Sequence, residues 1–221
     1  MTLRQAAMLL LALTAGGCTG SLFQTKAMPP TMYLLSAGGT SPLSASVPAA
    51  GAAPAAALSA DLAVLKPRVR AGLDTDRIAA VYPDRRLDYF ADSRWSGPLD
   101  EVIQDLVVQV FHSRAGMRNV SGDASAFASA YWLEITVTDF EAEYREAGGA
   151  TTVRVHLQAR IGSSAERRII ARFEADAEQP AGENRMTGIV AAYNQAANAA
   201  LAQLAANSVA ALASDAAGAT R

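Results

Sequence analysis

The feature that most limits the folds open to this chain is a period-two alternation of apolar and polar side chains in its second half. Three stretches, 131–137, 153–161 and 169–176, place apolar side chains at every second position. Such alternation is typical of strands that bury one face and leave the other in water. Because short links join the stretches, they predict an antiparallel meander of three strands. The polar positions of this meander include several basic side chains: Arg154, His156, Arg160 and Arg172.

Two segments with a helical period flank the meander. Between 99 and 111, apolar residues recur at steps of three and four, so that they form one face of a helix. Pro98 suits the first turn of this helix, and Gly116 can end it. The alanine-rich segment 184–212 predicts a second helix, after which 213–221 are expected to form a flexible C-terminal tail.

Shorter elements complete the expected fold. Segments 77–82 and 87–90 flank a Pro-Asp-Arg-Arg turn and predict a hairpin. Segment 62–69 is typical of a strand that Pro67 either ends or places at a sheet edge, and 32–35 predicts a short strand. Together these elements predict an α+β fold, a two-layer sandwich of an antiparallel or mixed sheet with two helices packed on one face.

One long segment inside this domain is not expected to be ordered. Residues 36–60 consist of small residues, prolines, one valine and two leucines, without a charged side chain. They cannot bury enough side chain to offset the entropy of ordering, which predicts a disordered loop. The folded domain is therefore assigned to residues 32–212, with this loop as an insertion.

The N-terminal residues have the three parts of a secretory signal. Arg4 supplies positive charge, residues 6–15 form an apolar run, and small residues follow. As a helix, that run would span about 15 Å, whereas the core of a bilayer is roughly 30 Å thick. The run is therefore too short for an ordinary membrane span, and no other stretch of the sequence is predicted to be one.

Cys18 is the only cysteine in the sequence, and the small residues of the signal lead directly to it. This arrangement resembles the bacterial lipoprotein signal, although Ala15 stands where that signal usually has leucine. The resemblance implies that residues 1–17 are removed, that Cys18 carries acyl chains such as palmitate, and that 18–31 form a tether. Thr19 in place of aspartate favours the outer membrane over the inner one. The alternative is a core cysteine beside an ordinary cleavage site.

The sequence offers little that could support catalysis. Its two histidines, His112 and His156, are expected at a helix end and on the polar face of a strand. The sequence lacks the motifs of a nucleophile elbow, a nucleotide-binding loop or a zinc protease, so no enzyme and no metal or cofactor site is predicted. The net charge of −2 gives no basic excess for nucleic-acid binding. Glu141, Glu143 and Glu146 are expected at a solvated hairpin tip.

Two groups of residues are candidates for contact with a partner. Trp95 precedes the first predicted helix, where an aromatic ring either packs into the core or meets another subunit. The basic positions of the meander are either solvated or contact a partner or an anionic lipid. They are Arg154, His156, Arg160 and Arg172.

The elements around Trp95 resemble a known family. Its members, the ABC-type transport auxiliary lipoproteins of the PqiC-like kind, have a hairpin strand, a tryptophan and a proline-led helix in this order. The residues that match this pattern here are Leu87, Tyr89, Trp95 and Pro98. The resemblance covers most of 31–210, and the long loop is a departure that leaves the matched elements intact.

This resemblance implies a role in the cell envelope. The chain would be a membrane-anchored, periplasm-facing accessory subunit of a system that moves lipids between the inner and outer membranes, and it would act by docking and not by catalysis. Its partners would be an MCE-domain protein, a permease and an ATPase. Homo-oligomerisation and direct lipid binding are compatible with the sequence. The alternative is an envelope scaffold or assembly chaperone for another outer-membrane complex.

Overall fold

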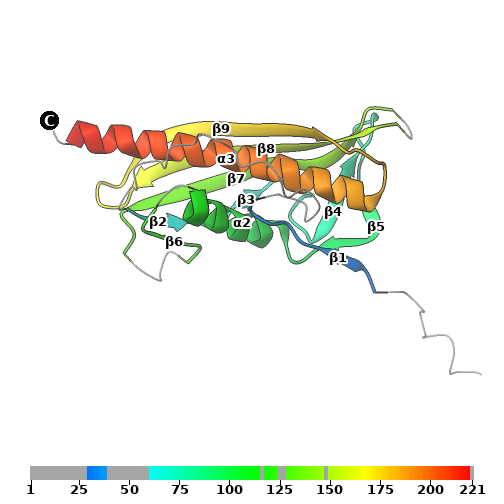
Figure 1. Cartoon of the computed structure of the whole chain (residues 1–221), viewed down its shortest axis with the longest axis horizontal. Helices are drawn as coiled ribbons and strands as arrows, with labels where there is room; N and C mark the ends of the chain where they lie inside the picture. The colour runs from blue at the N-terminus through cyan, green and yellow to red at the C-terminus, as the bar shows by residue number, and fades with distance from the viewer. Residues whose placement is uncertain (1–28, 39–59, 115–116, 124–127, 147–148, 220–221) are drawn as a thin grey trace, which may run out of the picture.

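The structure is a computed structural model, and it describes residues 29–38, 60–114, 117–123, 128–146 and 149–219. In these residues, one nine-stranded mixed sheet carries two helices on one of its faces (Figure 1). The predicted α+β sandwich is therefore confirmed. The predicted signal peptide with its cysteine, and most of the predicted tether and disordered loop, lie outside the described residues.

The predicted meander forms one side of the sheet. The strands of the meander pair antiparallel in sequence order, and they are β7 (Tyr131–Tyr144), β8 (Thr151–Ser163) and β9 (Arg168–Pro180), with β9 as the edge strand. In β7, a bulge lies between Val137 and Asp139. A bulge adds one residue to one strand, so the buried positions of β7 change from odd to even numbers. The buried apolar side chains of this strand are Leu133, Ile135, Val137, Phe140 and Ala142.

Three short strands follow one another along the other edge of β7 and pair with it in parallel. They are β2 (Asp61–Val64), β3 (Arg68–Val69) and β4 (Arg77–Val81). The sequence predicted β2 and β3 as one strand, but the structure breaks that strand around Pro67. Val64 lies opposite Leu133. Arg68 lies opposite Thr136. The chain from Val64 to Arg68 is therefore one residue longer than the part of β7 that it faces, from Leu133 to Thr136.

The sheet continues outward from these short strands. Beyond β2 lies β6 (Asn119–Ser121), which pairs with it in parallel. The predicted hairpin is confirmed, since β4 pairs antiparallel with β5 (Leu87–Trp95). The short strand predicted near the N-terminus is also present as β1 (Thr31–Tyr33), which pairs in parallel with β5 and ends the strand order on that side.

The covered face of the sheet carries α2 (Leu99–Arg114) and α3 (Met186–Ala219) (Figure 1). Helix α2 lies where the sequence predicts it. Helix α3 continues through most of the predicted flexible tail, so the predicted helix end at Leu212 is wrong. Leu212 is fully buried, and Asp215 forms an ion pair with Arg168 at the start of β9. The last part of α3 is thus held against the sheet.

Helix α3 is long and apolar enough to cross a membrane by length and composition, over Met186–Gly218. However, 50% of its most apolar window is buried inside the protein. Its buried residues, among them Ile189, Tyr193 and Leu201, belong to the core that the helix forms with β8 and β9. Packing as a core helix therefore accounts for its apolar composition.

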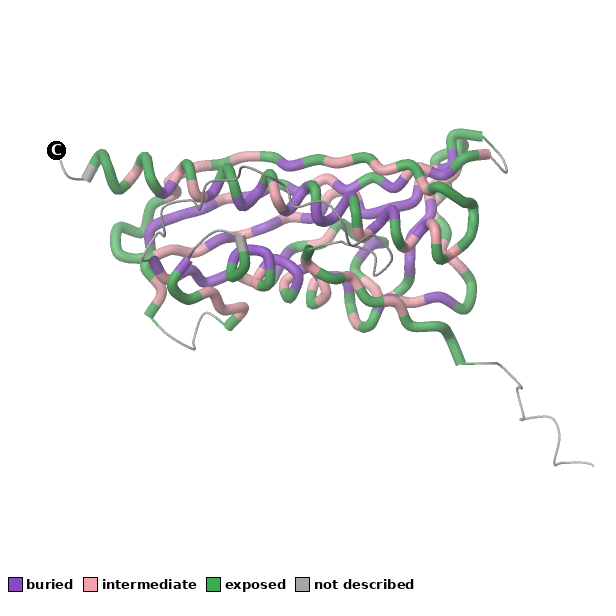
Figure 2. The backbone as a smooth tube through the Cα atoms, in the orientation of Figure 1, coloured by how far each residue is buried: buried purple, intermediate pink, exposed green. Residues whose placement is uncertain are grey.

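Three aromatic rings lie at the centre of this core. Trp95 packs edge-on against Phe140 and Tyr193, with ring centroids 5.8 and 5.1 Å apart. The Tyr193 hydroxyl donates a 2.7 Å hydrogen bond to the carbonyl oxygen of Ala79, and burial raises the pKa of Tyr193 well above its ordinary value. Figure 2 shows buried residues along the strands and on the helix turns that face them.

The segment that was predicted to be disordered is ordered at both ends. The backbone N–H of Ser36 donates to Asn194 Oδ1 at 2.9 Å. The N–H of Gly38 donates to Asn198 Oδ1 at 2.8 Å, and Asn198 Nδ2 donates back to the carbonyl oxygen of Ser36 at 2.8 Å. At the other end, Ala60 is buried. The disorder prediction is wrong for these residues, and the rest of the segment lies outside the described residues.

Candidate functional site on the open face of the sheet

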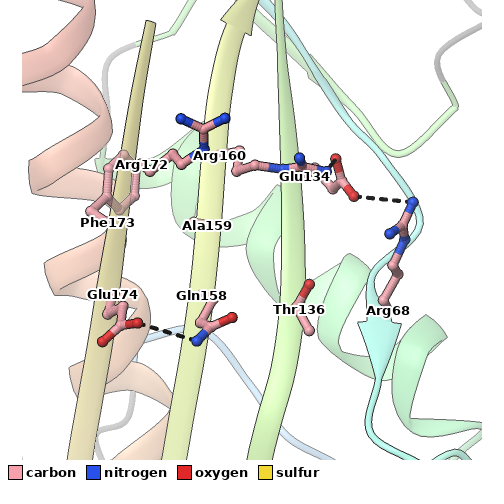
Figure 3. A pocket seen from close by; sticks show the side chains of 9 residues that line it. All are labelled: Arg68, Glu134, Thr136, Gln158, Ala159, Arg160, Arg172, Phe173 and Glu174. Atoms are coloured by element: carbon pink, nitrogen blue, oxygen red, sulfur yellow. Dashed lines mark hydrogen bonds and ion pairs between the residues drawn. The ribbon is translucent and has the colours of Figure 1, made fainter. Parts of the chain in front are cut away.

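The face of the sheet opposite the helices carries the polar positions of the meander. Across its middle, the strand register places Arg172 of β9 opposite Arg160 of β8, and Arg160 opposite Glu134 of β7. Arg68 of β3 reaches Glu134 from the other side of β7 (Figure 3). These four charged side chains form a row across four strands, which we call the arginine row.

The arginine row borders a shallow hollow of about 530 Å³. The hollow is also lined by polar Thr136 and Gln158, by Glu174, and by the residues Ala159 and Phe173 (Figure 3). The lining thus contains three arginines and two carboxylates, which leaves one positive charge in excess. A hollow of this kind suits an anionic group better than a neutral or cationic one.

Glu134 holds two of the three arginines. Arg160 Nη2 donates to Glu134 Oε2 at 2.5 Å, and Arg68 Nη2 lies 3.4 Å from Glu134 Oε1. Only 13% of the Glu134 side chain is exposed, so both pairs are partly shielded from water. Glu134 was not among the predicted site residues, although its place on the polar side of an alternating strand was a signal for this face.

Arg172 has a different environment. Its side chain is exposed, and the ion pairs among the described residues include Arg68 and Arg160 but not Arg172. It lies directly opposite Arg160 on the neighbouring strand, and like charges in that position destabilise a sheet. A carboxylate or phosphate group between Arg160 and Arg172 would offset this repulsion.

The other two predicted contact residues lie further along the same face. Arg154 Nε is 3.6 Å from Asp139 Oδ2. His156 Nδ1 is 3.7 Å from the same oxygen, and its Nε2 is 3.6 Å from Glu174 Oε2. The sequence prediction thus grouped side chains that do share a face. The structure divides them into Arg160 with Arg172 at the hollow, and Arg154 with His156 beside acidic neighbours.

Glu141 lies on the same face near its end and corrects one expectation. It was expected at a solvated tip, but it is only 9% exposed, because Arg70 pairs with both Glu141 and Asp139. Burial raises the pKa of Glu141, and the nearby positive charge of Arg70 opposes that rise. The sequence prediction placed Glu141 correctly near the end of a strand but missed the arginine that covers it.

Trp95 is not available as a surface contact. Its side chain is 1% exposed and packs within the aromatic centre of the core. The interpretation as a core residue is therefore confirmed, whereas the alternative of a partner contact through this ring is wrong. The ring fixes the approach of the chain to α2, since Trp95 ends β5 four residues before the helix begins.

The open face presents guanidinium and carboxylate groups. Within the part of the chain that the structure describes, no group of three or more His, Cys, Asp or Glu side chains is placed to hold a metal ion. His112 is exposed near the end of α2, far along the chain from His156 on β8. What the open face does offer is a set of oriented guanidinium groups, which bind planar anions in a two-pronged way.

Comparison with known proteins identifies the family. The model of the ABC-type transport auxiliary lipoprotein component matches residues 42–205. The chain belongs to this family. The matched range includes β2 to β9, α2 and α3 as far as Ala205, and with them the arginine row. The resemblance seen around Trp95 therefore extends through the meander and into α3. No curated protein sequence matches the chain.

Solved structures share the fold of this auxiliary lipoprotein. The protein XCC0632 from Xanthomonas campestris superposes with a TM-score of 0.69 at 23% sequence identity, covering 84% of this chain and 99% of that one. A second crystal structure, of an uncharacterised protein, gives a TM-score of 0.58 at 16% identity and covers 84% and 99% of the two chains. At such low identity these similarities concern the fold alone.

Proposed function

We propose that this auxiliary lipoprotein is a lipid-anchored subunit that faces the periplasm and serves an ABC transport system of the MCE type. It would help to move phospholipid or another lipid between the inner and outer membranes, and it would act by docking. The observation that carries the proposal is the family match over 42–205, together with a lipoprotein-like signal that ends at Cys18.

The anchor follows from the chemistry of Cys18. Its thiol accepts a diacylglycerol group, and the amine that is freed by cleavage accepts a further acyl chain. Each buried methylene contributes about 0.8 kcal/mol of membrane affinity, and more than one chain gives stable anchoring. Thr19 in the following position favours the outer membrane as the site of the anchor.

The docking surface in this proposal is the open face of the sheet. Its arginine row has one positive charge in excess at the hollow, and it holds one arginine, Arg172, outside the ion pairs of the described residues. Charges of this kind steer and orient a partner that carries the opposite sign. An acidic surface of the MCE-domain protein would fit this requirement.

Mutation of Cys18 tests the anchor. The Cys18→Ser variant cannot receive the acyl chain, so we expect loss of palmitate labelling and a protein that is either unprocessed or soluble. Globomycin, which blocks lipoprotein signal cleavage, should make the precursor of the natural protein accumulate. Palmitate labelling that persists in the serine variant would contradict the anchor assignment.

Co-purification tests the transport role. Pull-down of the lipidated chain from solubilised envelopes should recover an MCE-domain protein with its permease and ATPase, and the genes beside this one should encode them. Recovery of a different outer-membrane assembly without those subunits would favour the scaffold or chaperone alternative. The mass of the purified complex would also show whether the chain forms a homo-oligomer.

A further inference from the structure

Two exposed apolar side chains lie where the chain enters the domain. In the described part of the chain, the large hydrophobic residues that are exposed are Met32, with 55% of its surface accessible, and Leu34, with 75%. They are two positions apart on and just after β1, so they point to the same side of the strand. Tyr33 and Leu35, which alternate with them, pack against the core.

This apolar pair is held rigidly by the fold. Met32 sits in β1, which pairs in parallel with β5. Just beyond Leu34, the backbone of Ser36 and Gly38 is bound by Asn194 and Asn198 of α3 through three hydrogen bonds of 2.8–2.9 Å. Because the segment is ordered, it cannot rearrange locally to bury these two side chains. Exposed apolar side chains that lie together mark a contact surface.

The surroundings of the pair have the composition of a membrane interface. The register places Met32 beside Arg94, and Arg94 beside Arg77 on the next strand. The guanidinium of Arg77 lies 3.9 Å from the centre of the Tyr89 ring, while Arg94 is paired with Asp76 at 2.6 Å. Apolar groups beside arginine and tyrosine are typical of side chains that rest at the headgroup level of a bilayer.

The length of the chain before β1 identifies what can cover this surface. Residues 19–31 separate Cys18 from Met32, and at about 3.4 Å per residue these thirteen residues span at most about 45 Å. β1 is the first strand of the described chain (Figure 1). The part of the folded domain that is closest in sequence to the anchor is thus also the part with exposed apolar side chains.

We propose that Met32 and Leu34 rest in the headgroup region of the membrane that holds the acylated Cys18. The inference rests on the proposed anchor, and it adds an orientation: the β1 end of the sheet lies on the bilayer, and the turn between β8 and β9 points away from it. Leu34 lines a second, separate hollow together with acidic Glu101 and Asp105, which would repel anionic headgroups, so the proposed contact does not require anionic lipid.

Depth-dependent quenching tests this orientation. Leu34→Cys is introduced into the full lipidated chain, labelled with an environment-sensitive fluorophore, and placed in phosphatidylcholine vesicles that contain nitroxide-labelled lipid. Ala165→Cys is the matched control, because Ala165 is exposed in the β8–β9 turn at the other end of the sheet (Figure 1). We expect a blue shift and strong quenching at position 34, and neither at position 165.

Three outcomes would be informative. Equal quenching at both positions in a protein that still carries its acyl chains would overturn the inference and leave the anchor in place. A blue shift at position 34 that appears without quenching and grows with protein concentration would overturn it too, since another protein chain would then cover β1. Absence of palmitate on the purified protein would instead show that the proposed anchor itself is wrong.

Discussion

The two faces of the sheet are stabilised by different means. On the covered face, the inward side chains from Leu133 to Ala142 of β7 and from Val153 to Ile161 of β8 are at most 3% exposed and pack with the aromatic centre around Trp95. On the open face, side chains of opposite charge pair across neighbouring strands and remain partly exposed, as in Arg160 with Glu134. Packing therefore fixes the covered face, and charge pairing organises the open one. A substitution should be tolerated on the open face where it leaves the ion pairs intact.

The two tryptophans give the sharpest test of this difference. Trp95 lies in the covered core, whereas Trp132 is half-buried on the open side of β7, opposite Gly162. We expect Trp95→Ala to lower the free energy of unfolding by about 3–5 kcal/mol, because it leaves a large cavity. Trp132→Ala should cost about 1–2 kcal/mol, since its ring loses less buried surface.

Urea denaturation followed by circular dichroism measures both losses without relying on tryptophan emission. If Trp95→Ala does not fold, Trp95→Phe replaces it and should still cost more than Trp132→Phe. Equal losses at the two positions would show that the open face is packed as tightly as the covered one. In that case Trp132 and Gly162 would form a second core. An added Cβ at Gly162 would overlap the Trp132 ring.

Among the carboxylates that form ion pairs on the open face, Glu141 is the most buried. Arg70→Ala leaves the Glu141 carboxylate without its cation in a site where only 11% of its side chain is exposed. A hydrogen bond to a charged group contributes about 1.5–3 kcal/mol, so we expect a loss of about 2 kcal/mol at neutral pH. The loss should be smaller at low pH, where Glu141 is protonated.

The pH dependence follows from the direction of the shift. Burial raises the pKa of Glu141 in the folded protein, so the folded state holds this proton more tightly than the unfolded state does. This tighter proton binding stabilises the folded state fully below the pKa of Glu141 in the unfolded chain, near 4.3. The stabilisation is lost as the pH rises through the pKa of Glu141 in the folded protein. Glu141→Gln should remove this loss. If the free energy of unfolding of that variant depends on pH as it does in the natural protein, Glu141 is not the source of the pH dependence.

Much of the fold could be predicted because its signals are local. The alternation in β7, β8 and β9, the helical period of α2 and the hairpin before it each depend on neighbouring residues. The bulge after Val137 could not be predicted, since Thr138 and Asp139 look like ordinary polar positions. The parallel pairing of β2 and β3 with β7 also depends on contacts between residues far apart in the sequence.

The candidate site was predictable only in part for the same reason. Alternation placed Arg154, His156, Arg160 and Arg172 on one face, but it does not say which side chains lie opposite them. The register that sets Arg172 against Arg160, and Arg160 against Glu134, appears only when the strands are paired. Likewise, no local pattern links Asn194 and Asn198 to the backbone of Ser36 and Gly38, which lie about 160 residues away.

The smallest effect on stability is expected within the arginine row, where two reversals of charge should differ. Arg160→Glu places a carboxylate beside Glu134, the residue that now accepts its hydrogen bond. Lost attraction and new repulsion at a partly exposed pair should cost about 1 kcal/mol. Arg172→Glu breaks no ion pair within the described residues and removes the repulsion from Arg160, so its effect should stay within about 0.5 kcal/mol.

The effects of these substitutions on partner binding should not follow their effects on stability. If the hollow receives an anionic group of the MCE-domain protein, Arg172→Glu should weaken capture of that protein although the variant folds normally, because interface charges act on association without supporting the fold. Arg185→Glu is the matched control, with the same change of net charge at a side chain that is 81% exposed and lies outside the row. The measurement is pull-down beside thermal unfolding. Capture that falls equally in both variants would reflect net charge alone, and undiminished capture by a folded Arg172→Glu variant would assign the row to solvent.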